Sequence, residues 1–225
     1  MRDQFQDRVD AGQRLAAQLK GFANDPHTVV LGLPRGGVPV AYQVAQALNL
    51  PLDIFVVRKM GAPKQPELAI GAMASGGSYH LNEELIRRLE VSPSDIQAVM
   101  ESESREVLRR EEAYRGGRAP LNLKGQSVIL VDDGIATGAS MLVALQAIRG
   151  LGPREILVAV PVIAVSSIPD MERNADGLIY VTAPYEFRAV GQWYSNFDAT
   201  SDEEVRRLLK NATKYSPTKN FEERL

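Results

Sequence analysis

Two adjacent carboxylates, Asp132 and Asp133, stand where a continuous apolar run ends and a loop of small residues begins. The run at residues 128–131 consists of valine, isoleucine and leucine, which is typical of a strand buried on both faces of a parallel sheet. Ligands of such sheets bind at the carboxyl ends of the strands, where both carboxylates would lie. Residues 134–140 are small enough for backbone N–H groups to approach a phosphate, and a helix expected at residues 141–151 would add its positive dipole end.

A ligand with two kinds of group would explain this combination. Vicinal hydroxyls would donate hydrogen bonds to the carboxylates, while a phosphate would bind the loop and the start of the helix. A 5-phosphorylated ribose carries both groups. The alternative interpretation is an ordinary strand–turn–helix unit with a polar strand end.

The first core strand is expected at residues 28–33, and a basic loop follows it. Gly36 and Gly37 permit close approach of the backbone, and Arg35 offers a charged fork for an anion. A helix expected at residues 38–48 starts directly behind them. A turn with a surface arginine is the alternative.

A second buried strand is expected at residues 52–57, and it ends in Arg58 and Lys59. Cations at the carboxyl end of a core strand would face the same crevice as Arg35 and the carboxylates. Two solvated surface charges are the alternative.

Residues 128–140 resemble the phosphoribosyl pyrophosphate (PRPP) signature of type I phosphoribosyltransferases. In that family two acidic residues hold the ribose 2- and 3-hydroxyls, and the following loop holds the 5-phosphate. The resemblance implies that Asp132 and Asp133 bind the ribose and also hold Mg²⁺, directly or indirectly. It implies a phosphate loop made of Gly134, Ile135, Ala136, Thr137, Gly138, Ala139 and Ser140.

The same resemblance gives roles to the basic segments. Arg35, Gly36 and Gly37 match the family's pyrophosphate loop, and Arg58 and Lys59 would be further pyrophosphate contacts. Arg35 would therefore join the two aspartates as a catalytic residue, because it would stabilise the charge of the leaving pyrophosphate.

Residues 61–120 are expected to form an insertion that contains a flexible loop and helices. Residues 61–67 lack apolar periodicity, and the resemblance implies a lid here with Lys64 as its cation. Gly76 and Gly77 give a hairpin signal, and Ser92 followed by proline starts a long helix. The insertion's strands are expected at residues 69–73 and 78–81, and its helices at 83–89 and 92–114.

The alternation of strands and helices predicts an α/β fold, a doubly wound parallel sheet of about five strands, in a single domain over residues 1–225. An amphipathic helix at residues 3–21 would cover the sheet or start a subunit contact. The later elements are expected at residues 155–162 and 177–181 for strands and 166–174 for a helix.

Residues 183–225 are expected to form a small C-terminal hood and a tail. In the family such a hood covers the nucleobase. Phe187, Trp193 and Tyr194 are therefore candidates for a base-stacking platform or for its packing. A capping-box pattern at Thr200 and Ser201 predicts a helix through residue 209.

Composition limits the remaining possibilities. The chain has 225 residues, a net charge of −2 and no cysteine, so it offers neither a nucleic-acid signal nor thiolate chemistry. No apolar run reaches membrane-spanning length. We expect a cytoplasmic protein without nucleic-acid or membrane partners.

The resemblance implies a Mg²⁺-dependent phosphoribosyltransferase, a homodimer, that moves the phosphoribosyl group of PRPP to a nucleobase-like nitrogen acceptor. Hypoxanthine–guanine enzymes carry a carboxylate at the position of Ala136, so the acceptor stays open. One alternative is a PRPP or nucleotide sensor without turnover, which would need the same site. A weaker alternative is a phosphatase or phospho-receiver with Asp132 as nucleophile.

Overall fold

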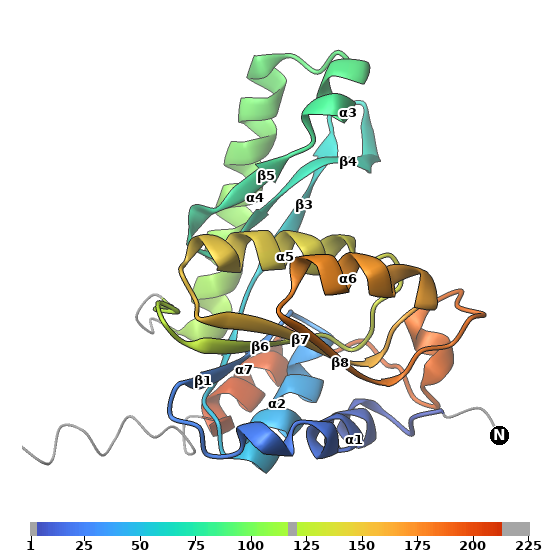
Figure 1. The fold of residues 1–225 in the computed structure, drawn as a ribbon. Helices are drawn as coiled ribbons and strands as arrows, with labels where there is room; N and C mark the ends of the chain where they lie inside the picture. The colour runs from blue at the N-terminus through green and yellow to red at the C-terminus, as the bar shows by residue number, and fades with distance from the viewer. Residues whose placement is uncertain (1–3, 117–120, 213–225) are drawn as a thin grey trace, which may run out of the picture.

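A five-stranded parallel sheet in the order β2-β1-β6-β7-β8 forms the centre of the computed structural model, which describes residues 4–116 and 121–212 (Figure 1). β1, β6 and most of β7 are buried along their length, because helices cover both faces of the sheet; this explains the unbroken apolar runs. The predicted α/β class is confirmed. The strands are β1 (Thr28–Gly32), β2 (Leu52–Ile54), β6 (Ser127–Val131), β7 (Glu155–Val162) and β8 (Gly177–Thr182).

Helices form a layer on each face of this sheet (Figure 1). Alternate residues of β1 and β6 point into the two separate cores between the sheet and its helices. One layer contains α1 (Arg8–Gln18), α2 (Gly37–Leu48) and α7 (Asp202–Ala212). The other layer contains α5 (Ala139–Gly150) and α6 (Ile168–Asn174).

The pairing of β1 with β6 creates a crevice at the edge of the sheet. These parallel neighbours pair in register from Thr28 opposite Ser127 to Gly32 opposite Val131. The chain leaves β1 into α2 on one face and leaves β6 into α5 on the other. Parallel sheets open a ligand crevice at such a point, outside the carboxyl ends of the two strands.

A second, antiparallel sheet projects from the first, with two helices beside it (Figure 1). It corrects two expectations. The strand expected at residues 52–57 is divided, since β2 ends at Ile54 and Val57 begins β3. The expected loop at residues 61–67 is a hairpin whose turn is Pro63 and Lys64. These elements are β3 (Val57–Ala62), β4 (Gln65–Ala74), β5 (Tyr79–Leu81), α3 (Glu83–Arg88) and α4 (Pro93–Arg115).

The glycine and proline that predicted a loop lie in a bulged part of this hairpin. The strand register shifts on both sides of Gly61. A Cβ at Gly61 would stand 2.5 Å from the carbonyl oxygen of Pro66, so the close approach of the two strands requires glycine there.

The C-terminal end of α4 is fixed to the main sheet. The Arg115 guanidinium lies 3.1 Å from Asp53 Oδ2 in β2, and the two side chains are 9% and 14% exposed. The hydroxyl of Tyr114 donates a hydrogen bond to Asp202 Oδ1 of α7 at 2.7 Å. The projecting sheet is thereby held to the layer that contains α2 and α7.

Among residues 4–116 and 121–212, no helix has the length and apolar character needed to cross a lipid bilayer.

Asp53→Asn is expected to lower stability, because it removes the charge that faces the largely buried guanidinium of Arg115. Breaking a buried ion pair on one side costs about 3 kcal/mol, which lowers the melting temperature by about 6–12 °C in a chain of this size. Thermal unfolding followed by circular dichroism measures the shift.

Glu106→Gln is the matched control, because Glu106 pairs with Arg109 and Arg110 on the surface of the same helix. Its loss should cost less than about 1 kcal/mol. Equal shifts for the two variants would contradict the anchoring role of Asp53.

Candidate functional site

Asp132 and Asp133 directly follow β6 and lie at the crevice between β1 and β6. One oxygen of each carboxylate is occupied: Asp132 Oδ1 accepts the backbone N–H of Asp133 at 2.8 Å, and Asp133 Oδ2 is bound by Arg8. The other oxygens, Asp132 Oδ2 and Asp133 Oδ1, accept no hydrogen bond from the described part of the chain. Both oxygens reach solvent. Among the described residues, the side-chain polar atom that is buried without a hydrogen-bond partner is Trp193 Nε1, and neither carboxylate oxygen is of that kind. Each carboxylate therefore offers one oxygen to a ligand.

Gly36 and Gly37 pack directly against the two carboxylates. A Cβ at Gly36 would collide with Asp133 Oδ2, and a Cβ at Gly37 would stand 2.8 Å from both Asp132 Cα and the carbonyl oxygen of Val131. Larger residues would push the start of α2 away from the acids. The N–H groups of Gly37 and Val38 donate to the carbonyls of Leu33 and Arg35, whereas the Gly36 N–H donates to no described residue and remains open to an anion.

The loop between β6 and α5 is held by hydrogen bonds to Val162 and Ser167, and several of its residues are exposed. Ile135 N donates to Val162 O at 2.9 Å, and the hydroxyl of Ser167 donates to Ala136 O at 2.5 Å. Gly138 adopts a φ of 75°, which glycine tolerates, and precedes α5 without a side-chain cap. Thr137, Ala139 and Ser140 are exposed. The structure therefore brings an open helix start next to the two acids.

Arg35 lies at the start of α2, where its Nη1 is 3.5 Å from Asp202 Oδ1. Its side chain is 50% exposed, so this ion pair is weak enough for an anionic ligand to compete with it. The peptide bond between Pro34 and Arg35 is cis.

The other predicted pyrophosphate contacts do not follow a core strand. Arg58 and Lys59 lie within β3 of the antiparallel sheet, because β2 ends earlier than expected. Arg58 Nε is 2.8 Å from Glu103 Oε2 of α4, so this guanidinium is bonded to the projecting unit.

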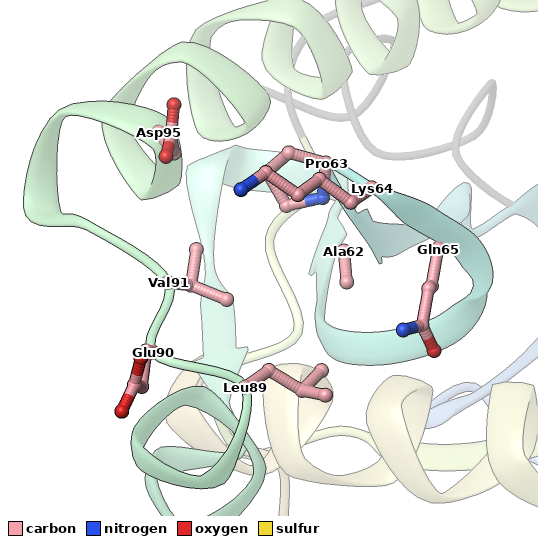
Figure 2. Close-up of a pocket in the computed structure, with 8 residues that line it drawn as sticks. All are labelled: Ala62, Pro63, Lys64, Gln65, Leu89, Glu90, Val91 and Asp95. Carbon is pink, nitrogen blue, oxygen red and sulfur yellow. The ribbon is translucent and has the colours of Figure 1, made fainter.

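Lys64 lies at the turn between β3 and β4, at the outer end of the projecting sheet (Figure 1). There it lines a cavity of about 100 Å³ together with the segment that joins α3 to α4 (Figure 2). The structure does not bring it together with the two aspartates. The lining residues are Ala62, Pro63, Lys64, Gln65, Leu89, Glu90, Val91 and Asp95.

The three aromatic candidates of the C-terminal segment are mostly used in packing. Trp193 and Tyr194 are 7% and 4% exposed, and the ring of Phe187 stacks on Trp193 with centroids 6.3 Å apart. The Tyr194 hydroxyl donates to the backbone carbonyl of Asp133 at 2.5 Å. This burial favours the packing interpretation, while Tyr185 of the same segment is 91% exposed.

Sequence reasoning missed Arg8. Its Nε and Nη2 lie 2.9 and 2.8 Å from Asp133 Oδ2, and its side chain is 12% exposed. The two residues are 125 positions apart, and the amphipathic pattern of α1 describes which face is apolar without indicating which charge reaches the sheet edge. No local signal could have identified it.

Burial dominates the electrostatics of the acid pair. Burial and the neighbouring Asp133 carboxylate raise the pKa of Asp132 well above 3.8. Burial also raises the pKa of Asp133, while the Arg8 guanidinium opposes that rise. Burial, together with the Asp133 carboxylate, raises the pKa of Tyr194, so its hydroxyl stays a neutral donor.

The donor set fits Mg²⁺ held jointly with a substrate. Residues 4–116 and 121–212 contain no group of three or more His, Cys, Asp or Glu side chains that could hold a metal alone. Mg²⁺ often binds to one or two carboxylates, waters and substrate phosphates, and the free oxygens of Asp132 and Asp133 supply that protein share.

Comparisons with known proteins identify the family of the chain. The family model for the phosphoribosyl transferase domain matches residues 1–178. The chain therefore belongs to the phosphoribosyl transferase family.

Three relatives illustrate the membership. A Mycobacterium tuberculosis H37Rv protein, provisionally named a phosphoribosyl transferase, is 44% identical over 211 residues, which are 92% of this chain and 47% of that protein. The chain thus spans about half the length of this relative and of its counterpart in another strain of the same species. An adenine phosphoribosyltransferase of Pseudomonas paraeruginosa is 32% identical over 168 residues, 70% of this chain and 83% of that enzyme. The crystal structure of TT1426 from Thermus thermophilus superposes with a TM-score of 0.80 at 39% identity, covering 92% of this chain and 98% of that one.

Asp132→Asn is expected to stabilise the ligand-free protein at neutral pH. The amide keeps Oδ1 as acceptor for the Asp133 N–H and removes a buried negative charge. Because the folded-state pKa lies above the ordinary 3.8, the folded protein binds more protons than the unfolded chain between these values. The wild type therefore loses stability as the pH rises through the folded-state pKa, and the variant does not.

Thermal unfolding between pH 4 and 8 measures this difference. The variant should melt about 2–4 °C above the wild type at pH 7, the shift for about 1 kcal/mol, with a smaller gap at pH 4. A variant that melts below the wild type at every pH would refute the inference that the buried charge of Asp132 destabilises the folded protein.

Proposed function

We propose that this protein moves the 5-phosphoribosyl group of PRPP to a nucleobase-like nitrogen acceptor and releases pyrophosphate, with Mg²⁺ as cofactor. One observation carries the proposal: free carboxylate oxygens of Asp132 and Asp133 lie beside the open helix start at residues 135–140. The acids suit vicinal hydroxyls and the helix start suits a 5-phosphate. The proposal includes a cytoplasmic homodimer, as the family resemblance implies.

The two aspartates would orient the ribose and offset charge on its ring. Departure of pyrophosphate builds positive charge on the sugar, and a fixed pair of carboxylates stabilises that charge without reorganising. Neither carboxylate needs to transfer a proton. Ala136 has no group that could do so, which leaves protonation of the acceptor to other groups.

The leaving pyrophosphate would bind at the start of α2. The open N–H of Gly36 would donate to one of its oxygens, and Arg35 would exchange Asp202 for the anion. Mg²⁺, when bound, supplies charge neutralisation for the pyrophosphate and ribose oxygens, and Asp132 and Asp133 would hold it directly or through water.

A nucleobase is the acceptor class that the relatives support, since one of them is named an adenine phosphoribosyltransferase. A PRPP or nucleotide sensor is the second candidate. It is favoured by the position of Lys64 in the cavity of the projecting sheet, which leaves the proposed lid cation apart from the acid pair.

Incubation with PRPP, Mg²⁺ and single nucleobases is expected to release pyrophosphate with at least one base, measured by a coupled phosphate assay. The double variant Asp132→Asn/Asp133→Asn should lose about 100-fold or more of that rate, because it removes the charge that would stabilise the ribose ring. The matched control is Asp170→Asn/Glu172→Gln, two acids on α6, of which Asp170 pairs with Arg173 and Glu172 is exposed. PRPP binding without release for any base would favour the sensor.

Arg35→Ala is expected to weaken PRPP binding about tenfold and ribose 5-phosphate binding less than about twofold, because only PRPP carries the pyrophosphate. Isothermal titration calorimetry with both ligands measures the two losses. Arg173→Ala is the control, since Arg173 is also exposed and paired with one carboxylate, Asp170 of α6. Equal losses for both ligands would remove the pyrophosphate role of Arg35.

A further inference from the structure

Arg8 connects the two ends of the described chain to the acid pair. Its Nε donates to Asp133 Oδ2 at 2.9 Å, its Nη2 lies 2.8 Å from the same oxygen, and its Nη1 donates to the backbone carbonyl of Asp198 at 2.7 Å. All three guanidinium nitrogens are therefore engaged with the protein itself. The side chain is 12% exposed, so this arrangement excludes most of the solvent.

Aromatic rings fix the plane of the Arg8 guanidinium. The carbon at its centre lies 4.0 Å from the centroid of the Phe197 ring and 6.0 Å from that of Tyr194. Tyr194 also donates its hydroxyl to the carbonyl of Asp133. A Cβ at Gly36 would come within 3.3 Å of Arg8 Nη2, so the guanidinium also lies against the loop that precedes α2.

The backbone supports this arrangement from both ends. Phe5 N donates to Trp193 O and Ser195 N donates to Phe5 O, each at 2.8 Å, so residues 5–8 run beside the C-terminal segment. Arg8 follows this paired stretch and is the first residue of α1. Asp133 is thus held by a guanidinium whose own position is fixed by backbone pairing and ring stacking.

We propose that Arg8 is a positioning residue for ribose recognition: it holds Oδ2 of Asp133 so that Oδ1 faces the crevice where a sugar hydroxyl binds. This inference rests on the proposed function. Arg8 acts through Asp133, because each of its three guanidinium nitrogens already lies against a protein oxygen: Nε and Nη2 against Asp133 Oδ2, and Nη1 against the carbonyl of Asp198.

A role limited to fixing α1 would not require this chemistry. Buried ion pairs bring little net stability compared with apolar contacts of the same size. Only arginine has a planar fork that can bind a carboxylate and a carbonyl while stacking on a ring, whereas lysine offers a point charge on a flexible stem. The identity of the residue therefore matches the task of orienting one oxygen of Asp133.

Titration with ribose 5-phosphate and, separately, with inorganic phosphate tests the inference. Inorganic phosphate can use the loop at residues 135–140 or the start of α2 but has no hydroxyls for the carboxylates, so it reports on anion binding without the ribose contacts. Arg8→Gln should weaken ribose 5-phosphate binding about tenfold or more and leave inorganic phosphate within about twofold, the size expected when a charged group loses its oriented partner. Arg8→Lys should give an intermediate loss for ribose 5-phosphate.

Arg14→Gln is the matched control. Arg14 lies on the same helix, stacks over the Phe5 ring at 4.5 Å and pairs with Asp10 at 3.8 Å, without contact to the acid pair. It should bind both ligands as the wild type does. If Arg8→Gln does not fold, the folded Arg8→Lys variant carries the comparison.

Four outcomes overturn the inference. Unchanged ribose 5-phosphate affinity in both Arg8 variants would show that Asp133 needs no partner. Tighter binding would show that Arg8 blocks the site. Equal losses of both ligands would indicate a structural role only. Absence of ribose 5-phosphate binding to the wild type would instead refute the proposed function, and the inference with it.

Discussion

The pairing of β1 with β6 is the constraint on which the rest of the molecule depends. These neighbours send their helices to opposite faces, so an open crevice forms beyond their carboxyl ends. The Gly36–Gly37 turn and the Asp132–Asp133 pair follow these two strands and therefore meet there. Glycine at both turn positions then allows backbone and carboxylate to touch. A different strand order would separate the same residues.

The charges of the Asp132–Asp133 pair lower the stability of the folded protein. Burial raises the pKa of both carboxylates, which means that ionised aspartates oppose folding at neutral pH. Arg8, stacked on the Phe197 ring and bonded to the C-terminal segment, offsets the charge on Asp133. Helix α1 and the segment around Tyr194 thereby become part of the site, although neither carries a recognisable motif.

The projecting sheet shows where sequence reasoning succeeds and where it fails. Ser92 followed by proline predicted the start of α4, and the Gly76–Gly77 turn predicted the β4–β5 connection, because both depend on local backbone chemistry. The β3–β4 hairpin was missed, because its glycine and proline serve a bulge between paired strands, which only the partner strand reveals. The core strand that the sequence predicts to end before Arg58 and Lys59 ends at Ile54 instead, and both cations lie in β3.

The sequence by itself determined the α/β class, the positions of the core strands apart from the end of β2, and the two acids followed by a small loop at residues 132–140. Unbroken apolar runs, cap residues and small loops depend on neighbouring residues in the chain, so the sequence alone reveals them. Tertiary structure alone decided which face each helix covers, that Trp193 and Tyr194 are buried, and that Arg8 reaches Asp133. These outcomes depend on contacts between residues far apart in the chain, whose energies no local pattern encodes.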